Sequence, residues 1–85
     1  SNLIPEKIIS PRQAFTAIKK SFIKRSIGQI SGEYIIPYPP GISLTSPGEI
    51  ITQEVVDYIL ECKKYGMHVS GLKDSSLEII EIIDR

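Results

Sequence analysis

The feature that most constrains this chain is a cluster of prolines and glycines near its middle. Four of the six prolines and two of the six glycines fall within residues 37–48. Proline fixes φ and has no backbone N–H, so this stretch can form neither a helix nor a central strand. Proline lowers the conformational entropy of the segment, and glycine adopts backbone conformations that other residues avoid. We therefore expect a shaped loop that can hold a side chain in a set position.

Length and composition limit the class of protein. The chain has 85 residues, 41% of them hydrophobic and 24% charged, with zero formal net charge. A domain this short buries about 60% of its extended surface, which suffices for one modest core and excludes a large self-contained enzyme. The apolar content excludes a disordered protein, and no apolar run approaches the roughly 18 residues of a membrane span. We expect a cytoplasmic protein.

The ends of the chain suggest a piece of something longer. The sequence opens Ser1-Asn2 without an initiator methionine, and no secretion leader is recognisable. We expect residues 1–2 to be a remnant of cloning and residues 3–85 to be one domain, a fragment of a longer protein.

A first helix is predicted from Ser10 to about Lys24. Ser10 is a suitable N-cap, Pro11 suits the first helical position and Gln13 completes a capping box. The apolar residues that recur at helical spacing are Ala14, Phe15, Ile18 and Phe22. We expect the two phenylalanines to lie in the core.

The remaining pattern predicts one more helix and three short strands. Thr52 is a suitable N-cap for a helix that Gly66 would end. Residues 33–36, 67–70 and 77–83 are typical of strands, the last of them apolar on both faces and so interior to a sheet. The 17 isoleucines also favour a sheet. The expected fold is a small two-layer α+β domain, with two main helices packed on a small mixed sheet and a long Pro/Gly-rich structured loop.

Charge is unevenly distributed along the chain. Residues 1–42 carry six basic and two acidic residues, whereas residues 43–85 carry four basic and eight acidic residues. The basic half could be a solvated helix face, a surface for nucleic acid or a surface that docks on an oppositely charged part. Nucleic acid is disfavoured because the cluster lacks interleaved aromatic residues and any known binding motif. A small α+β interaction module, whose basic helix docks on an acidic protein or nucleic acid, remains an alternative.

Side chains for catalysis, metal binding or phosphate binding are scarce. The single cysteine, Cys62, and the single histidine, His68, are separated by a predicted helix end, so we expect Cys62 to act as a small hydrophobic residue. The glycines at 28 and 32 lack the spacing of a nucleotide-binding loop. We therefore expect no catalytic, cofactor-binding or metal-binding residue in this chain.

One carboxylate in the sequence occupies a position suited to binding a cation. Glu49 follows Pro47 and Gly48 directly and comes just before the helix capped by Thr52. A carboxylate fixed by a Pro-Gly turn can bind a cation, because its geometry is restricted before binding. Alternatively, Glu49 is a charge that favours the start of the helix.

The same segment resembles a known family. Tyr38-Pro39-Pro40-Gly41-Ile42, followed by Pro47-Gly48-Glu49 and a threonine-capped helix, is similar to the C-terminal domain of the bacterial ornithine/lysine/arginine decarboxylases, which are pyridoxal-phosphate enzymes of fold type I. The likeness extends over most of residues 10–83. Two positions differ, because Gln29 stands where the family usually has arginine and Ser43 where it usually has proline.

The resemblance implies a role for each part of this segment. Glu49 would face the distal cation of a basic amino-acid substrate, on a mount of Pro47 and Gly48. Supporting loop residues would be Tyr38, Pro39, Pro40 and Gly41. The family's Ser-x-His-Lys type motif is absent, so an upstream domain would bind pyridoxal phosphate and this chain alone would be inactive. The expected partners are that domain and a second subunit of a homodimer, and the product would be a polyamine precursor.

Overall fold

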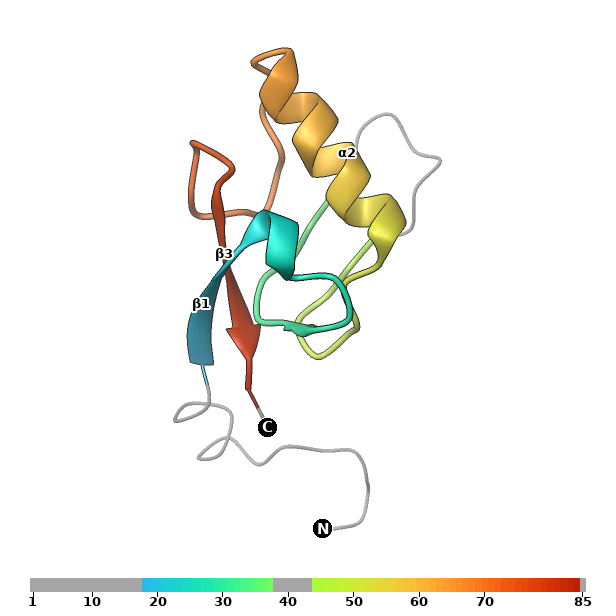
Figure 1. Cartoon of the computed structure of the whole chain (residues 1–85), viewed down its shortest axis with the longest axis vertical. Coiled ribbons are helices and arrows are strands. Elements are labelled where there is room, and N and C mark those ends of the chain that lie inside the picture. Colours follow the sequence, from blue (N-terminus) through green and yellow to red (C-terminus); the bar gives the residue numbers. More distant parts are fainter. Residues whose placement is uncertain (1–17, 38–43, 85) are drawn as a thin grey trace, which may run out of the picture.

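A computed structural model describes residues 18–37 and 44–84 of the chain. Within these residues lie three strands, a short 3-10 helix and one α-helix, shown in Figure 1. In chain order they are β1 (Ile18–Phe22), η1 (Ile23–Arg25), β2 (Ile30–Ser31), α2 (Gln53–Lys64) and β3 (Ile79–Ile83). In Figure 1 the β1 and β3 strands lie side by side, and η1 lies between them and α2.

The strands form an antiparallel sheet in the order β1-β3-β2. Ile18 pairs with Ile83 and Phe22 with Ile79, while Ile30 of β2 also pairs with Ile83. The interior position predicted for the last strand is confirmed. The prediction of a mixed sheet is wrong, because both neighbours run antiparallel to β3.

The predicted first helix is wrong over the residues that the structure describes. Residues 18–22 form β1, and only residues 23–25 turn into a 3-10 helix. Phe22 is 59% exposed instead of buried, and the next residue, Ile23, takes the core position. The backbone groups along one edge of β3 need partners, and the pairing with β1 supplies them, so tertiary pairing overrides the local helical pattern. Ser10, Ala14 and Phe15 lie outside the described residues.

The other two predicted strands are largely reduced to isolated bridges. β2 lies at Ile30–Ser31 and is shorter than the strand expected at 33–36. In that segment Ile35 bridges to Thr45 and Ile36 bridges to Ser70. The strand expected at 67–70 is represented by the Ser70 bridge alone among the described elements.

The second predicted helix is confirmed. The backbone N–H of Val55 donates to Oγ1 of Thr52 at 3.2 Å, and Glu54 lies in the first turn, where its charge favours the helix dipole. Basic residues occupy the last turn, and the chain leaves the helix at Gly66, whose φ is +69°. The buried face of α2 consists of Val55, Val56, Ile59 and Cys62.

The core joins α2 to one face of the sheet. Its buried side chains come from η1, α2, β3 and the loops between them, with Ile23, Ile59, Ile80 and Ile82 among them. Part of the predicted Pro/Gly-rich loop, residues 38–43, lies outside the described residues. Over residues 18–37 and 44–84, no helix is long and apolar enough to cross a membrane.

Candidate functional site

Glu49 ends a tight turn. Its backbone N–H donates to the carbonyl oxygen of Ser46 at 3.0 Å, which closes a four-residue turn. Pro47 occupies the second position, and Gly48 occupies the third with a φ of +94°. This is the residue pattern of a type II turn, in which the third position requires a positive φ. The Pro-Gly turn expected from the sequence is therefore present.

Backbone pairing fastens this turn to the sheet. Gly48 N–H donates to the carbonyl of Ser31, and Ser31 N–H donates to the carbonyl of Glu49, both at 2.8 Å. Farther along, Ile51 N–H donates to the carbonyl of Gln29 at 2.8 Å. Since Ser31 belongs to β2, which pairs with β3, the Glu49 backbone is tied to the central strand through one intermediate segment.

Glu49 is exposed, and within residues 18–37 and 44–84 its carboxylate accepts one hydrogen bond. Its Oε1 accepts the backbone N–H of Ser46 at 2.9 Å. This hydrogen bond within the turn limits the conformations of the Glu49 side chain. Because the residue is exposed, its carboxylate remains accessible to a ligand. Of the predicted site residues, Pro47, Gly48 and Glu49 lie together here, while Tyr38, Pro39, Pro40 and Gly41 lie outside the described residues.

Glu33 is a buried carboxylate that sequence reasoning missed. Its Oε2 accepts the backbone N–H of Glu81 at 2.7 Å, and its Oε1 accepts the backbone N–H of Lys73 at 2.9 Å. The hydroxyl of Ser31 donates to the Glu33 carbonyl at 2.6 Å and accepts its N–H at 3.1 Å. Glu33 therefore holds the end of β2, the strand that carries the Glu49 turn. Both carboxylate partners are distant in sequence, so no local signal marks this role.

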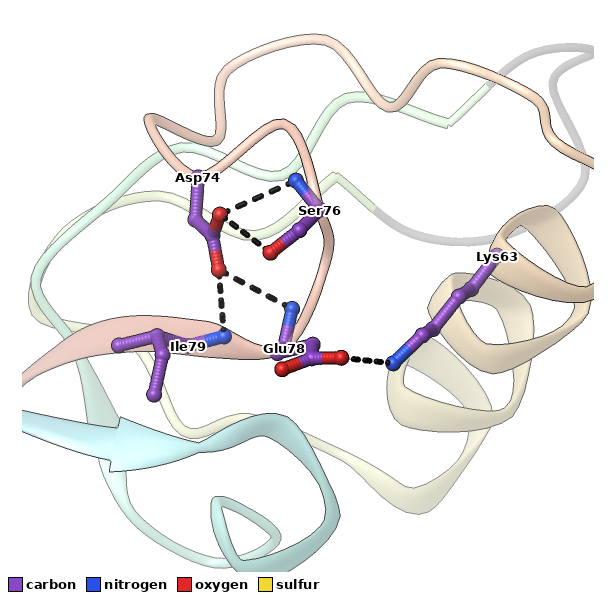
Figure 2. Close-up of polar contacts among 5 residues, drawn as sticks. All are labelled: Lys63, Asp74, Ser76, Glu78 and Ile79. Carbon is purple, nitrogen blue, oxygen red and sulfur yellow. Dashed lines mark hydrogen bonds and ion pairs between the residues drawn. The ribbon is translucent and has the colours of Figure 1, made fainter.

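Asp74 organises the turn that leads into β3, as Figure 2 shows. Its Oδ1 accepts from the hydroxyl and the N–H of Ser76, and its Oδ2 accepts from the N–H groups of Glu78 and Ile79. The hydrogen bonds from Ser76, with help from the two other N–H groups, lower the pKa of Asp74 to about 2. This turn also holds Leu77 at a φ of 57°, an uncommon value for a leucine.

A cavity of about 310 Å³ lies away from the Glu49 turn. It is lined by the last residue of β1, by η1, by the C-terminal half of α2 and by the two residues just before β3. Across it, Lys63 Nζ and Glu78 Oε2 form an ion pair at 2.9 Å, drawn in Figure 2. The lining residues are Phe22, Ile23, Lys24, Arg25, Leu60, Lys63, Leu77 and Glu78. Glu49 is not among them, so this cavity and the predicted site are separate features.

The other candidate side chains form no reactive group. Cys62 is buried in the core cluster, as expected of a small hydrophobic residue, whereas His68 is exposed. Within residues 18–37 and 44–84, no three His, Cys, Asp or Glu side chains are grouped so as to hold a metal ion. Hydrogen bonds from Lys19 to Asp84 and from Lys73 to Glu81 raise the pKa of both lysines and favour their charged forms.

Known proteins resemble this chain along nearly all of its length. The arginine decarboxylase of Bacillus subtilis (strain 168) is 41% identical over 81 residues, which is 94% of this chain and 16% of that protein. The constitutive lysine decarboxylase of Escherichia coli (strain K12) is 33% identical over 78 residues, which is 82% of this chain and 11% of that protein. The chain thus spans less than a fifth of the length of either relative.

Solved structures show the same fold. The E. coli constitutive lysine decarboxylase superposes with a TM-score of 0.60 at 25% identity, over 98% of this chain and 14% of that one. The Francisella novicida lysine decarboxylase LdcF superposes with a TM-score of 0.58 at 31% identity, over 96% of this chain and 14% of that one. Residues 2–77 match the family described as "Orn/Lys/Arg decarboxylase, C-terminal domain". With agreement over so much of its length, this chain belongs to the C-terminal domain family of the Orn/Lys/Arg decarboxylases.

Proposed function

We propose that this chain is the C-terminal domain of a pyridoxal-phosphate decarboxylase that converts a basic amino acid to a polyamine precursor. The names of its relatives, arginine and lysine decarboxylase, support this class of reaction. Because the chain spans only 16% of the first of these relatives, the reaction itself would depend on the rest of a longer protein. In isolation the domain is expected to be inactive. A cytoplasmic location and a homodimeric enzyme are parts of the same proposal.

Glu49 is the residue that we assign to the substrate. A decarboxylase for lysine, arginine or ornithine must bind an ammonium or guanidinium group several bonds from the reacting carbon. A carboxylate does so through charge-assisted hydrogen bonds, which are about twice as strong as neutral ones. The supporting observation is that the Glu49 backbone is paired with Ser31 while its side chain is exposed. Such a carboxylate loses little freedom when a cation binds.

The cofactor would be held outside this chain. Pyridoxal phosphate supplies an electron sink for the carbanion left when carbon dioxide departs. Its site needs a lysine that can react as a neutral amine. The Ser-x-His-Lys type motif that the family resemblance implies for this lysine is absent from the sequence. We therefore assign this domain a substrate contact and contacts with other domains, and no cofactor contact.

The alternative of a basic helix that docks on nucleic acid or an acidic protein gains no support from the described residues. Lys19 and Lys20 lie on β1 instead of a helix. Lys19 is also engaged by Asp84 at 2.6 Å, so part of the basic charge of the N-terminal half pairs with the acidic half of the same domain.

The test is Glu49→Gln in the full-length enzyme. Glutamine keeps the shape of the side chain but removes its charge, so we expect the KM for the basic amino acid to rise about tenfold or more, a loss of about 1.4 kcal/mol. The absorbance of the bound cofactor should not change. Glu54→Gln, an exposed charge change five residues away in the first turn of α2, is the matched control. An unchanged KM in Glu49→Gln would show that Glu49 does not bind the cationic end of the substrate.

A further inference from the structure

The cavity lined by η1 and α2 has the size and the lining of a small-molecule site. Its volume of about 310 Å³ lies at the lower end of the range for ligand pockets, about 300–1,000 Å³. Such pockets combine an apolar lining with a few charged or polar groups. We call it the η1–α2 cavity; its apolar lining residues are Phe22, Ile23, Leu60 and Leu77, and its charged ones are Lys24, Arg25, Lys63 and Glu78.

Hydrogen bonds join the walls of the η1–α2 cavity. The backbone N–H of Ile23 donates to the carbonyl of Glu78 at 2.9 Å, which ties η1 to the segment before β3. The hydroxyl of the buried Ser26 donates to the Ile23 carbonyl at 2.7 Å and so closes η1. Two of the apolar lining residues, Ile23 and Leu77, are also buried in the core. The cavity therefore has fixed walls before any ligand binds, which lowers the entropic cost of binding.

The Asp74 turn holds the third wall in place. Leu77 has a φ of 57°, a conformation that leucine avoids unless the surrounding structure imposes it. Here its N–H donates to the Asp74 carbonyl at 3.0 Å, and the Asp74 carboxylate accepts the N–H of Glu78 at 3.1 Å, as Figure 2 shows for the carboxylate. The turn thereby places Leu77 and Glu78, one apolar and one charged, side by side in the lining of the η1–α2 cavity.

The charged lining residues carry an excess of positive charge. Three are basic and one is acidic, although the whole chain has zero formal net charge. The Nζ of Lys63 pairs with Glu78 Oε2 at 2.9 Å, so these two charges compensate each other. Within residues 18–37 and 44–84, the side chains of Lys24 and Arg25 have no carboxylate partner. An arginine guanidinium is suited to binding a carboxylate through two parallel hydrogen bonds. The η1–α2 cavity therefore favours an anionic ligand.

We propose that the η1–α2 cavity binds an amphipathic carboxylate, a small molecule with one carboxylate group on an apolar body. Arg25 and Lys24 bind the carboxylate. The apolar body packs on Phe22 and Leu60. An inorganic anion would leave the apolar lining unused, and a basic amino acid would be repelled by the excess positive charge. Since Glu49 is not a lining residue, this second site does not depend on the proposed function.

The test measures binding of 3-phenylpropionate to the full-length protein by saturation-transfer difference NMR. We expect it to bind more tightly than its neutral analogue 3-phenylpropan-1-ol, and 3-phenylpropylamine not to bind. Arg25→Gln should weaken binding of the carboxylate about tenfold or more and leave that of the alcohol unchanged. Lys64→Gln is the matched control, because Lys64 follows Lys63 but does not line the cavity, and should change the affinity by less than about twofold.

A second variant tests the apolar part of the η1–α2 cavity. Phe22→Ser, at an exposed side chain, should weaken binding of the carboxylate and the alcohol alike. Equal affinity for 3-phenylpropionate in Arg25→Gln and the parent would mean that the compound binds elsewhere and would overturn the proposal. Equal affinities for carboxylate and alcohol, displacement by an equal concentration of inorganic phosphate, or no binding would also overturn it. Glu49→Gln should leave this binding unchanged, so the two proposals can fail separately.

Discussion

The carboxylate of Glu33 accepts the backbone N–H of Glu81, 48 residues farther along the chain, at 2.7 Å. The carbonyl of Glu81 in turn accepts the N–H of Gly32 at 2.8 Å. The β2 strand ends at Ser31. Beyond this point the Glu33 side chain, in place of a strand backbone, accepts a hydrogen bond from β3. Its second oxygen reaches Lys73, so one buried side chain joins three segments.

Removal of this carboxylate should destabilise the fold. Glu33→Ala leaves two N–H groups without their acceptor, and we expect the free energy of unfolding to fall by about 3 kcal/mol. Glu33→Gln should cost less, because one oxygen remains to accept a hydrogen bond. Urea unfolding followed by circular dichroism measures both. Glu61→Ala, at an exposed site on α2, should stay within about 0.5 kcal/mol of the parent. Equal stabilities for the Glu33 and Glu61 variants would contradict this role.

Asp74 should make stability depend on pH in the acid range. Its pKa falls from an ordinary 3.8 to about 2 in the folded state, so the folded state favours the charged carboxylate. The contribution is therefore fully present above about pH 4 and is lost as the pH falls toward about 2. The midpoint of urea unfolding, measured from pH 6 down to pH 2, should decrease over this interval.

Asparagine does not titrate, so Asp74→Asn is the matched variant for this pH dependence of stability. It should be less stable than the parent at pH 6, and the difference between the two should shrink as the pH falls to about 2. Ser76→Ala removes the hydroxyl that donates at 2.6 Å and should weaken the same dependence in part. A constant difference between parent and Asp74→Asn across the range would show that Asp74 is not the group responsible.

Two glycines with positive φ offer a matched pair. A Cβ on Gly71 would collide with the carbonyl oxygen of Tyr34, whereas a Cβ on Gly66 would meet open space. Gly66→Ala therefore carries only the cost of a left-handed backbone, about 1–2 kcal/mol. Gly71→Ala carries the same cost plus a clash with backbone, about 2–5 kcal/mol in total. Thermal unfolding of the two variants should separate them clearly, and equal melting temperatures would contradict the clash.

The α2 helix could be predicted in detail because its determinants are local. Thr52, Glu54 and Gly66 lie within or next to the helix, and each acts on backbone groups only a few residues away. The tight turn before Glu49 was predictable for the same reason. Pro47 and Gly48 specify its conformation without help from distant residues.

The structure of β1 and the role of Glu33 could not be predicted in this way. The partners of β1 lie at residues 79–83, and those of Glu33 at Lys73 and Glu81. The spacing of Ile18 and Phe22 suits a helix face as well as one face of a strand, and only the pairing with β3 decides between them. The attachment of the Glu49 turn to residues 28–31 has the same origin, because it depends on where β2 lies.

The turn before Glu49 should be sensitive to its glycine even though there is space for a side chain. Gly48 has a φ of +94°, and a Cβ there would meet nothing within 4 Å. Gly48→Ala therefore strains only the backbone, by about 1–2 kcal/mol, and shifts the turn away from the geometry that positions Glu49. In the full-length enzyme we expect the KM for the basic amino acid to rise several-fold. Gly48→Asn should raise it less, because asparagine tolerates a positive φ better than alanine does. If alanine and asparagine both leave KM at the parent value, the turn does not position the substrate contact, whatever Glu49 itself does.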